Sequence, residues 1–377
     1  MTQRSNRRTF LLGVAAAAGA AGSASAASAP IRTAFIGVGN RGTSLLKQTI
    51  AEDGVNITAI CDIDASARDR ALSLASDSNP KSYTNWEEII DLKDIDAVKI
   101  ATPCYLHAEM AVAALKAGKY VYCEKPLGVT PEQVASVMKA AKGAKGFLQI
   151  GQQLRYFPSV RASIKALHED RIAGDIYVVR AQRNGAAPKE PRSRPAWYEE
   201  SSKSGDLIVE NSVHNIDICN WIVEGHPVSA YGHGGRYVGD FMAPGKQMMD
   251  SFSVEYIYDK DTHVDYTQLS LHARGFKEIP NGQYYAIYGE KGTVFMTHSN
   301  ATFYDMQGEQ QPLELVPAEA QDAKDFAMQS FYECIRDGKQ PFADIKVGAT
   351  AALTAILGRE AIYKGASVNW DDLGVRI

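Results

Sequence analysis

Short runs of β-branched and other apolar residues alternate with helical stretches through the first part of the chain, starting at residue 31. The expected strands cover residues 31–36, 56–60, 95–101, 120–123 and 147–151, and the expected helices begin near residue 41 and cover 66–75, 106–117 and 131–141. Regular alternation of strand and helix is typical of a parallel sheet with helices on both faces. We therefore predict a doubly wound α/β domain over residues 30–152.

The pattern changes after residue 174, where apolar and polar residues alternate with a period of two. The expected strands cover 176–182, 251–258, 263–271, 284–288 and 293–296, and the expected helices cover 159–168, 208–222, 324–336 and 347–363. A period of two indicates half-buried, antiparallel strands. Residues 153–377 should form an α+β domain with an open, mainly antiparallel sheet that binds substrate and associates with further copies. The last two helices either cover this sheet or return to the first domain.

The N-terminus has the features of a secretion signal. Arg7 and Arg8 precede an apolar run, and Ala-x-Ala cleavage sites follow at 24–26 and 27–29. This order is typical of a twin-arginine signal, which predicts export of residues 30–377 through the twin-arginine translocase to the periplasm or beyond. The apolar run is about half of the roughly 20 residues that a membrane span needs, so we expect no stable insertion. An uncleaved tether is the alternative.

The composition is that of a globular protein, with 45% hydrophobic and 22% charged residues in a chain of 377. The 44 acidic and 40 basic residues give a formal net charge of -4, which disfavours nucleic acid or anionic lipid as a partner. The five cysteines lack the spacing of a zinc site or disulfide framework. We therefore expect buried thiols and no metal.

A glycine-rich turn lies between the first expected strand and helix. Its residues are Gly37, Val38, Gly39, Asn40, Arg41 and Gly42. In a dinucleotide-binding turn the first glycine permits the tight bend, the second lets the pyrophosphate approach, and the third allows close helix packing. Asp62 ends the second strand, where a carboxylate accepts hydrogen bonds from the adenine ribose and repels a 2′-phosphate. The sequence thus predicts NAD rather than NADP, with Asp64 as a weaker candidate for the ribose contact.

Further candidates follow the expected strands 95–101 and 120–123, because the carboxyl ends of strands border the ligand crevice in open α/β sheets. The expected cofactor contacts there are Thr102, Pro103, His107, Glu124 and Lys125. Lys125 stands between Glu124 and Pro126, and the proline favours an extended backbone for the lysine. Its ammonium would face a substrate oxygen that develops negative charge.

A polar stripe marks the expected helix over residues 208–222. At 100° per residue, Glu210, His214, Asp217 and Trp221 share one face, whereas the other faces are apolar. A carboxylate one turn away can orient an imidazole that takes a hydroxyl proton near neutral pH. We predict catalytic roles for Glu210, His214 and Asp217, with a buried, merely hydrogen-bonded histidine as the alternative.

The chain resembles the Gfo/Idh/MocA family in four features taken together. They are the GxGxxG turn, the Thr102-Pro103 pair, the segment from Ala117 to Pro126 that ends in Glu-Lys-Pro, and the acid and histidine four residues apart. The resemblance implies a Rossmann domain, an open-faced sheet domain, and hydride transfer between NAD(P) and a carbinol carbon of a sugar or polyol. It implies that Lys125 polarises the reacting oxygen while His214 moves its proton. The family more often has Asp where this chain has Glu210.

Substrate recognition is expected from aromatic and guanidinium groups, which suit sugar faces and hydroxyls. The candidates are Arg155, Tyr156, Trp197 and Tyr198, together with Arg192, Arg194 and Trp221. The resemblance leaves three alternatives open: a tightly bound NAD recycled between two sugars, an NAD-dependent glycoside hydrolase using transient oxidation, and a sugar sensor without turnover. The open sheet favours a homo-oligomer.

Overall fold

The computed structural model describes residues 29–377 except 187–193, 260–261, 280, 309–310 and 322–325. The expected signal segment therefore lies outside the described residues, apart from Ala29. Among the helices that the structure describes, none combines the length and apolar character needed to cross a membrane.

The first domain contains a six-stranded, wholly parallel sheet in the order β3-β2-β1-β4-β5-β6. Its strands are β1 (Ile31–Ile36), β2 (Val55–Cys61), β3 (Lys81–Tyr83), β4 (Ala97–Ile100), β5 (Tyr120–Cys123) and β6 (Leu148–Ile150). Its helices are α1 (Asn40–Ile50), α2 (Ala65–Leu74), α3 (Trp86–Asp91), α4 (His107–Lys116) and α5 (Pro131–Lys142). The strand order reverses between β1 and β4, and ligands bind at such a switch point. The predicted doubly wound fold is confirmed.

The second domain contains a nine-stranded mixed sheet in the order β14-β13-β12-β11-β7-β10-β9-β8-β15. Its strands are β7 (Ile176–Asn184), β8 (Ser229–Gly235), β9 (Ser251–Ile257), β10 (His263–Leu269), β11 (Gly282–Gly289), β12 (Gly292–Met296), β13 (Ala301–Asp305), β14 (Leu313–Glu314) and β15 (Val368–Asn369). All paired strands are antiparallel except β7 and β10. The expected open, mainly antiparallel sheet is confirmed.

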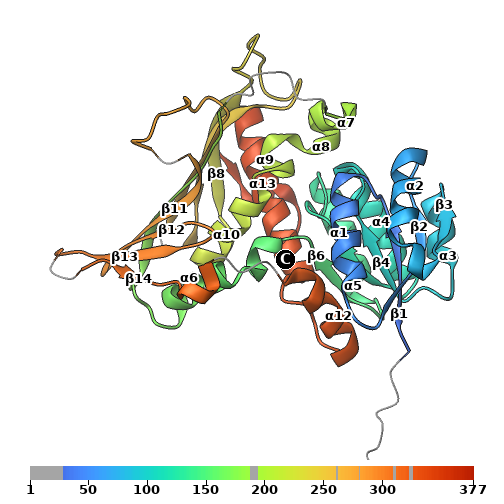
Figure 1. Ribbon diagram of the computed structural model, residues 1–377. Helices are drawn as coiled ribbons and strands as arrows, with labels where there is room; N and C mark the ends of the chain where they lie inside the picture. Colours follow the sequence, from blue (N-terminus) through green and yellow to red (C-terminus); the bar gives the residue numbers. More distant parts are fainter. Residues whose placement is uncertain (1–28, 187–193, 260–261, 280, 309–310, 322–325) are drawn as a thin grey trace, which may run out of the picture.

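The helices that follow the first domain are α6 (Pro158–His168), α7 (Ala196–Glu199), α8 (Ser201–Ser204), α9 (Asp206–Glu210), α10 (Val213–Val223), α11 (Ala318–Gln321), α12 (Ala327–Asp337) and α13 (Ile345–Lys364). Among the described residues, α10 and α13 pack against one face of the nine-stranded sheet. Short 3-10 helices occur at Ser76–Ser78, Cys104–Leu106, Gln153–Tyr156 and Trp370–Leu373. Figure 1 shows α9, α10 and α13 between the nine-stranded sheet and the first domain.

The last two long helices join the domains. The Tyr332 hydroxyl of α12 lies 3.2 Å from the Thr33 hydroxyl of β1, so this helix packs on the first domain. In α13, a Cβ on Gly348 would lie 3.2 Å from Ile150 of β6, and one on Gly358 would lie 2.2 Å from the Tyr256 hydroxyl of β9. The backbone of α13 thus touches both sheets, and the two alternatives for the C-terminal helices are both realised.

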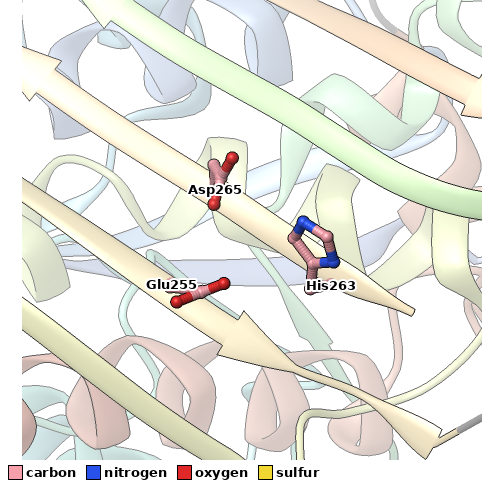
Figure 2. A group of neighbouring side chains, drawn as sticks. All are labelled: Glu255, His263 and Asp265. Atoms are coloured by element: carbon pink, nitrogen blue, oxygen red, sulfur yellow. The ribbon is translucent and has the colours of Figure 1, made fainter. Parts of the chain in front are cut away.

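The opposite face of the nine-stranded sheet carries polar side chains. Figure 2 shows Glu255 of β9 beside His263 and Asp265 of β10, and their potential ligand atoms lie within 4.8 Å of one another. Arg180 of β7 forms an ion pair of 3.3 Å with Asp265. Because strand residues alternate between faces, Arg183 of the same strand projects to the opposite side, toward the first domain.

Candidate active site

The glycine-rich turn has the geometry that a dinucleotide requires. Gly37 has φ +86°, and a Cβ there would lie 2.7 Å from the Ala101 carbonyl oxygen. A Cβ on Gly42 would lie 2.1 Å from the Gly37 carbonyl oxygen, whereas one on Gly39 would meet no atom within 4 Å. Gly39 is the N-cap of α1 and offers no side chain to the first-turn N–H groups. These donors are therefore available to a phosphate.

Asp62 is held beside this turn. Its Oδ2 accepts a hydrogen bond of 2.7 Å from the Val38 N–H, and its Oδ1 accepts one of 2.9 Å from the Asp64 N–H. Asp64 caps α2 by accepting bonds from the Ser66 and Ala67 N–H groups, and these contacts, the Ser66 hydroxyl first, lower its pKa. Asp64 thus has a helix-capping role, which leaves Asp62 as the candidate carboxylate for the ribose contact.

Arg41 and Glu124 form one unit at the edge of the turn. Arg41 Nε donates to Glu124 Oε1 over 2.6 Å, and a further nitrogen of Arg41 contacts Gln153 Oε1. Glu124 is buried, whereas the neighbouring Asn40 is exposed. The Arg41 guanidinium therefore neutralises the Glu124 carboxylate where both were expected to contact the cofactor.

His107 contacts the segments that follow two neighbouring strands. Its Nε2 lies 2.8 Å from the Thr102 carbonyl oxygen and its Nδ1 lies 2.7 Å from the Pro126 carbonyl oxygen. The ring is 1% exposed, and burial lowers its pKa despite these two contacts. The structure thus gives His107 a positioning role for the Thr102-Pro103 and Lys125-Pro126 segments and leaves neither ring nitrogen for the cofactor.

Lys125 pairs with Glu210 across the domain boundary. Its Nζ lies 3.1 Å from Glu210 Oε1 and also donates to the Glu210 carbonyl oxygen. Burial opposes the ammonium, but the negative charges of Glu210 and Glu124 outweigh it and raise the pKa of Lys125. Burial likewise opposes the Glu210 carboxylate, but the Lys125 charge and the Tyr198 hydroxyl lower its pKa. Both groups are charged at neutral pH.

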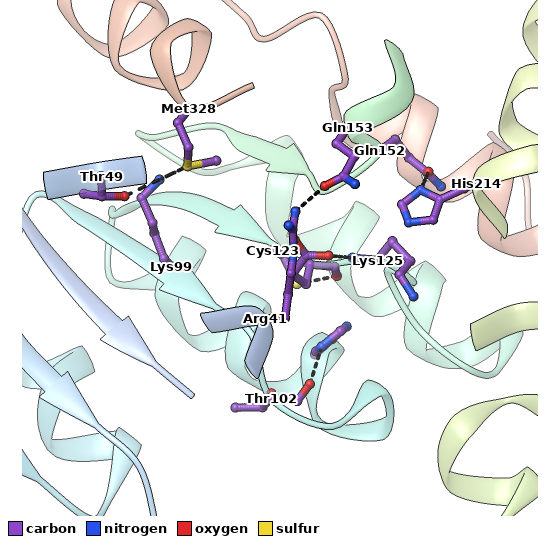
Figure 3. A network of polar contacts seen from close by, with 12 residues as sticks. Arg41, Thr49, Lys99, Thr102, Cys123, Lys125, Gln152, Gln153, His214 and Met328 are labelled. Atoms are coloured by element: carbon purple, nitrogen blue, oxygen red, sulfur yellow. Dashed lines mark hydrogen bonds and ion pairs between the residues drawn. The ribbon is translucent and has the colours of Figure 1, made fainter. Parts of the chain in front are cut away.

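His214 is held in one tautomer by Gln152. Its Nδ1 lies 2.9 Å from Gln152 Oε1, as Figure 3 shows, while Gln152 Nε2 donates to the Val213 carbonyl oxygen over 3.3 Å. Since the amide oxygen can only accept, Nδ1 carries the proton and Nε2 has a free lone pair. Burial and the positive charges of Lys125 and Arg183 hold the pKa of His214 well below its ordinary value.

The polar stripe does not lie on one helix. The chain bends at Asn211 and Ser212, so Glu210 ends α9 and His214 stands in the first turn of α10. The prediction of a continuous helix over residues 208–222 is wrong. The hypothesis that a carboxylate one turn away orients His214 is also wrong, because Gln152 holds its Nδ1.

Three expected site residues are engaged elsewhere. Arg155 Nε and a second nitrogen bind both oxygens of Asp217 over 2.8 and 2.9 Å, with the two residues 8% and 1% exposed. The Arg155 guanidinium also lies 4.7 Å from the Trp221 ring centroid. Tyr156 is 2% exposed, and its hydroxyl accepts from the Ala343 N–H over 3.1 Å. The structure does not bring Asp217, Arg155 or Tyr156 to the Lys125 and His214 pair.

The other substrate candidates lie nearer. The rings of Trp197 and Tyr198 pack 5.6 Å apart, and Arg194 lies 4.2 Å from the Tyr198 ring centroid. Burial and the Glu210 charge raise the pKa of Tyr198, so its hydroxyl remains protonated beside Glu210. Arg192 lies outside the described residues.

Sequence reasoning missed Gln152 and Arg183. Gln152 directly follows the expected strand that ends at residue 151, in the position where neighbouring strands carry their functional groups. Arg183 lies one residue beyond the expected strand 176–182, which the structure extends to Asn184. Strand-end position was the available signal for both residues.

Comparison with known proteins identifies relatives for most of the chain. Residues 31–152 match the family described as "Oxidoreductase family, NAD-binding Rossmann fold", and residues 161–295 match the "GFO/IDH/MocA C-terminal domain". Inositol 2-dehydrogenase of Salmonella typhimurium is 30% identical over 195 residues, which cover 51% of this chain and 54% of that protein. The chain thus matches only about half the length of that relative.

Two further relatives match over greater lengths. The scyllo-inositol 2-dehydrogenase (NAD(+)) of Bacillus subtilis is 24% identical over 325 residues, covering 82% of this chain and 88% of that protein. The structure of levoglucosan dehydrogenase in complex with NADH and L-sorbose superposes with a TM-score of 0.75 at 19% identity, covering 92% of this chain and all of the other. With both of its domains matched in sequence and its fold shared, the chain belongs to the Gfo/Idh/MocA family and has an NAD-binding Rossmann domain.

Proposed function

We propose that this protein transfers hydride between NAD and a carbinol carbon of a sugar or polyol. The observation that carries the proposal is that Lys125 of the first domain lies close enough to His214 of the second for its charge to lower the pKa of the histidine, which sets a charged lysine near a neutral histidine. Environments that push two pKa values apart assign one group as the acid and the other as the base. The relatives named for inositol and levoglucosan support a polyhydroxylated substrate.

The residues of the first domain fit the dinucleotide. The uncapped first turn of α1 and the open side of Gly39 would hold the pyrophosphate, and Asp62 would hold the adenine ribose. When bound, NAD supplies the hydride acceptor. Asp62 favours NAD over NADP because its carboxylate repels a 2′-phosphate.

The chain's own groups handle the oxygen and its proton. The Lys125 ammonium donates a hydrogen bond to the reacting oxygen and stabilises negative charge there. His214 Nε2 accepts the hydroxyl proton during oxidation and returns it during reduction. Gln152 keeps Nδ1 protonated, and Glu210 holds Lys125 in its charged form. Trp197 and Tyr198 offer aromatic faces to the CH groups of the carbohydrate.

The test is oxidation of a panel of free sugars, glycosides and inositols by the purified full chain, followed as NADH absorbance. Lys125→Met and His214→Ala should each lower turnover by about 10²-fold or more if they move or stabilise the proton. Arg180→Gln, on the far face of the sheet, is the control. If both site variants retained wild-type rates, or if no panel member changed the redox state of NAD, the proposal would be wrong.

We further propose that residues 1–29 direct export by the twin-arginine route with NAD already bound. Support comes from Arg7, Arg8 and the Ala-x-Ala sites. The full chain should reach the periplasm of a bacterium in processed form, and Arg7→Lys with Arg8→Lys should retain it in the cytoplasm. Equal export of the double variant would refute the assignment. Purified exported protein without nucleotide absorbance would refute preloading.

A homo-oligomer is proposed on the uncovered face of the nine-stranded sheet, where Tyr231 of β8, Tyr288 of β11 and Tyr304 of β13 are exposed. Exposed aromatic rings of this kind can pack against the same surface of a second copy. Light scattering of the full chain should give a multiple of the 41.0 kDa chain mass, reduced by any cleaved signal. A monomer at micromolar concentration would refute this.

A further inference from the structure

The proposed site has more positive charges than it can pair internally. Lys125 is paired with Glu210 and Arg41 with Glu124, at N···O distances of 3.1 and 2.6 Å. Arg183 also faces this site, because its charge acts on His214. Within the described ranges of the chain, no carboxylate forms an ion pair with Arg183, whose polar contact is to a backbone carbonyl oxygen. One guanidinium charge therefore lacks a counterion.

Arg183 projects from β7 toward the bend between α9 and α10. One of its terminal nitrogens lies 3.5 Å from the Asn211 carbonyl oxygen, at the outer limit of a hydrogen bond. The Lys125 ammonium donates to the carbonyl oxygen of the preceding residue, Glu210. The two cations are thus anchored on consecutive carbonyls, and Arg183 keeps most of its five N–H donors.

The polar neighbours of Arg183 are committed to each other. Gln268 and Gln283 flank Arg183 on the adjacent strands β10 and β11. Gln268 donates to Asn211 Oδ1 and accepts from the Ser212 hydroxyl, whereas Gln283 accepts from Asn215 Nδ2 over 3.0 Å. These amides hold the α9–α10 bend in place. Arg183 is the charged member of this row, and most of its N–H donors are left for a ligand.

Arg194 brings a further guanidinium close to Glu210. It stacks on Tyr198, and its charge acts on Glu210. Among the described residues, the ion pairs of the protein include neither Arg183 nor Arg194. Burying a cation without a counterion costs free energy, and a bound ligand of opposite charge offsets that cost.

We propose that the carbohydrate bound here carries a carboxylate, as a uronic or aldonic acid does, and that Arg183 binds it. The inference rests on the proposed function, because it names the substrate class of the same site. The planar fork of a guanidinium matches a carboxylate with two parallel hydrogen bonds. A monoanion is the favoured ligand, since Arg183 is half-buried and offers one positive charge, which is a poor match for a phosphate dianion.

The experiment compares matched sugars that differ in one group: glucose with glucuronate and glucose 6-phosphate, and galactose with galacturonate. Turnover is followed as NADH formation by the full chain, and binding is measured by calorimetry on the NADH-loaded protein. The acid should exceed its neutral partner by about 10- to 100-fold in kcat/KM or affinity, the range for hydrogen bonds to charged groups. Added NaCl should reduce this preference.

Variants assign the effect to one residue. Arg183→Gln should abolish the preference for the acid, and Arg183→Lys should retain part of it because the charge remains without the fork. Arg180→Gln is the matched control: the same substitution on the same strand, at an exposed residue of the opposite face. It should leave the preference intact.

The outcomes separate the two proposals. One outcome would be equal oxidation rates for each neutral sugar and its acid, with Arg183→Gln changing both rates equally. Arg183 would then only cap the α9 carbonyls. This result would overturn the inference and leave the proposed function in place. A preference for the phosphate over both other sugars would also overturn it. Acids that bind through Arg183 without any change in NAD would uphold the inference and overturn the proposed function.

Discussion

Replacing Gln152 by Glu should move the pH dependence of the reaction without changing the shape of the site. Gln152 Oε1 is a neutral acceptor 2.9 Å from His214 Nδ1. A carboxylate at this place attracts the imidazolium, and two unit charges about 4 Å apart interact by about 4 kcal/mol at an effective dielectric of 20. That equals about 3 pKa units at 1.36 kcal/mol each, and burial of the new carboxylate offsets part of it. We expect the pKa of His214 to rise by about 1–2 units.

The sign follows from the protonation state that the histidine needs. His214 accepts a proton only when neutral, so oxidation is lost as the pH falls through its pKa. In the native protein that pKa lies well below 6.5, because burial and nearby cations disfavour the imidazolium. The acid limb of kcat/KM should therefore lie well below pH 6.5 in the native protein and move toward neutral pH in Gln152→Glu.

The assay is NAD reduction between pH 5 and pH 9 with the best substrate of the panel. Gln152→Met removes the hydrogen-bond acceptor and keeps a side chain of similar volume. The unsatisfied Nδ1–H of His214 should cost about 1–3 kcal/mol, or about 5- to 150-fold in rate. The acid limb of the pH profile should not move to higher pH. Gln182→Glu makes the same charge change on the outer sheet face, where Gln182 accepts from the Tyr284 hydroxyl over 2.8 Å. If Gln152→Glu lowered the rate equally at all pH values, the tautomer argument would fail.

Three further predictions concern other parts of the chain. Asp62→Ser should raise the affinity for NADPH relative to NADH by about tenfold or more in a fluorescence titration, because the repelling carboxylate is gone; an unchanged ratio would remove Asp62 from the ribose site. Asp217→Asn should lower stability in urea by about 3–5 kcal/mol by leaving Arg155 unpaired, with KM and kcat of the remaining folded protein near native; a selective loss of kcat would restore a catalytic role. Lys99 is fully buried beside Met328 Sδ, and burial lowers its pKa. Because the unfolded chain then binds more protons than the folded one, the free energy of unfolding should rise with pH up to about 10.5. Lys99→Met should raise the melting temperature and reduce the dependence of the free energy of unfolding on pH.

The first domain could be predicted from sequence because its signals are local. The turn from Gly37 to Gly42 specifies its backbone by the absence of side chains: a Cβ at either of those two glycines would collide with a carbonyl oxygen. Asp62 directly follows β2, Lys125 lies two residues beyond the end of β5, and parallel strands bring their carboxyl ends to one edge. The place of these residues in the sequence was therefore enough to predict that they lie at the same edge of the sheet.

The catalytic helix was predicted less well because helical periodicity assumes a continuous helix. The bend at Asn211 and Ser212 is fixed by Gln268, which lies 56 residues after Ser212 in the sequence and bonds both of them. The partner of His214 is Gln152, 62 residues earlier. Contacts of this range depend on packing of separate elements, and a single sequence does not encode them as a spacing.

The wrong assignments have a related cause. Arg155 and Asp217 are the residue types that bind sugars and protons, but each satisfies the other over 62 residues, in a bidentate pair beneath Trp221. A buried charge needs a partner, and residue type alone does not reveal whether that partner is a ligand or the protein itself. Arg183 is the converse case: within the described chain it forms no ion pair, and one contact of 3.5 Å to the Asn211 carbonyl oxygen leaves most of its donors free.

The bend between α9 and α10 is the feature that assembles the site. The last carbonyls of a helix have no N–H partner within that helix. At this bend the carbonyl of Glu210 receives the Lys125 ammonium, and that of Asn211 lies within 3.5 Å of the Arg183 guanidinium. A continuous helix would bond both carbonyls internally and remove the anchors of both cations. Lys125 belongs to the first domain and Arg183 to the second, so side chains of both domains contact the backbone of the bend. This explains why Gln268 holds Ser212 and Asn211 by hydrogen bonds and does not leave them to solvent.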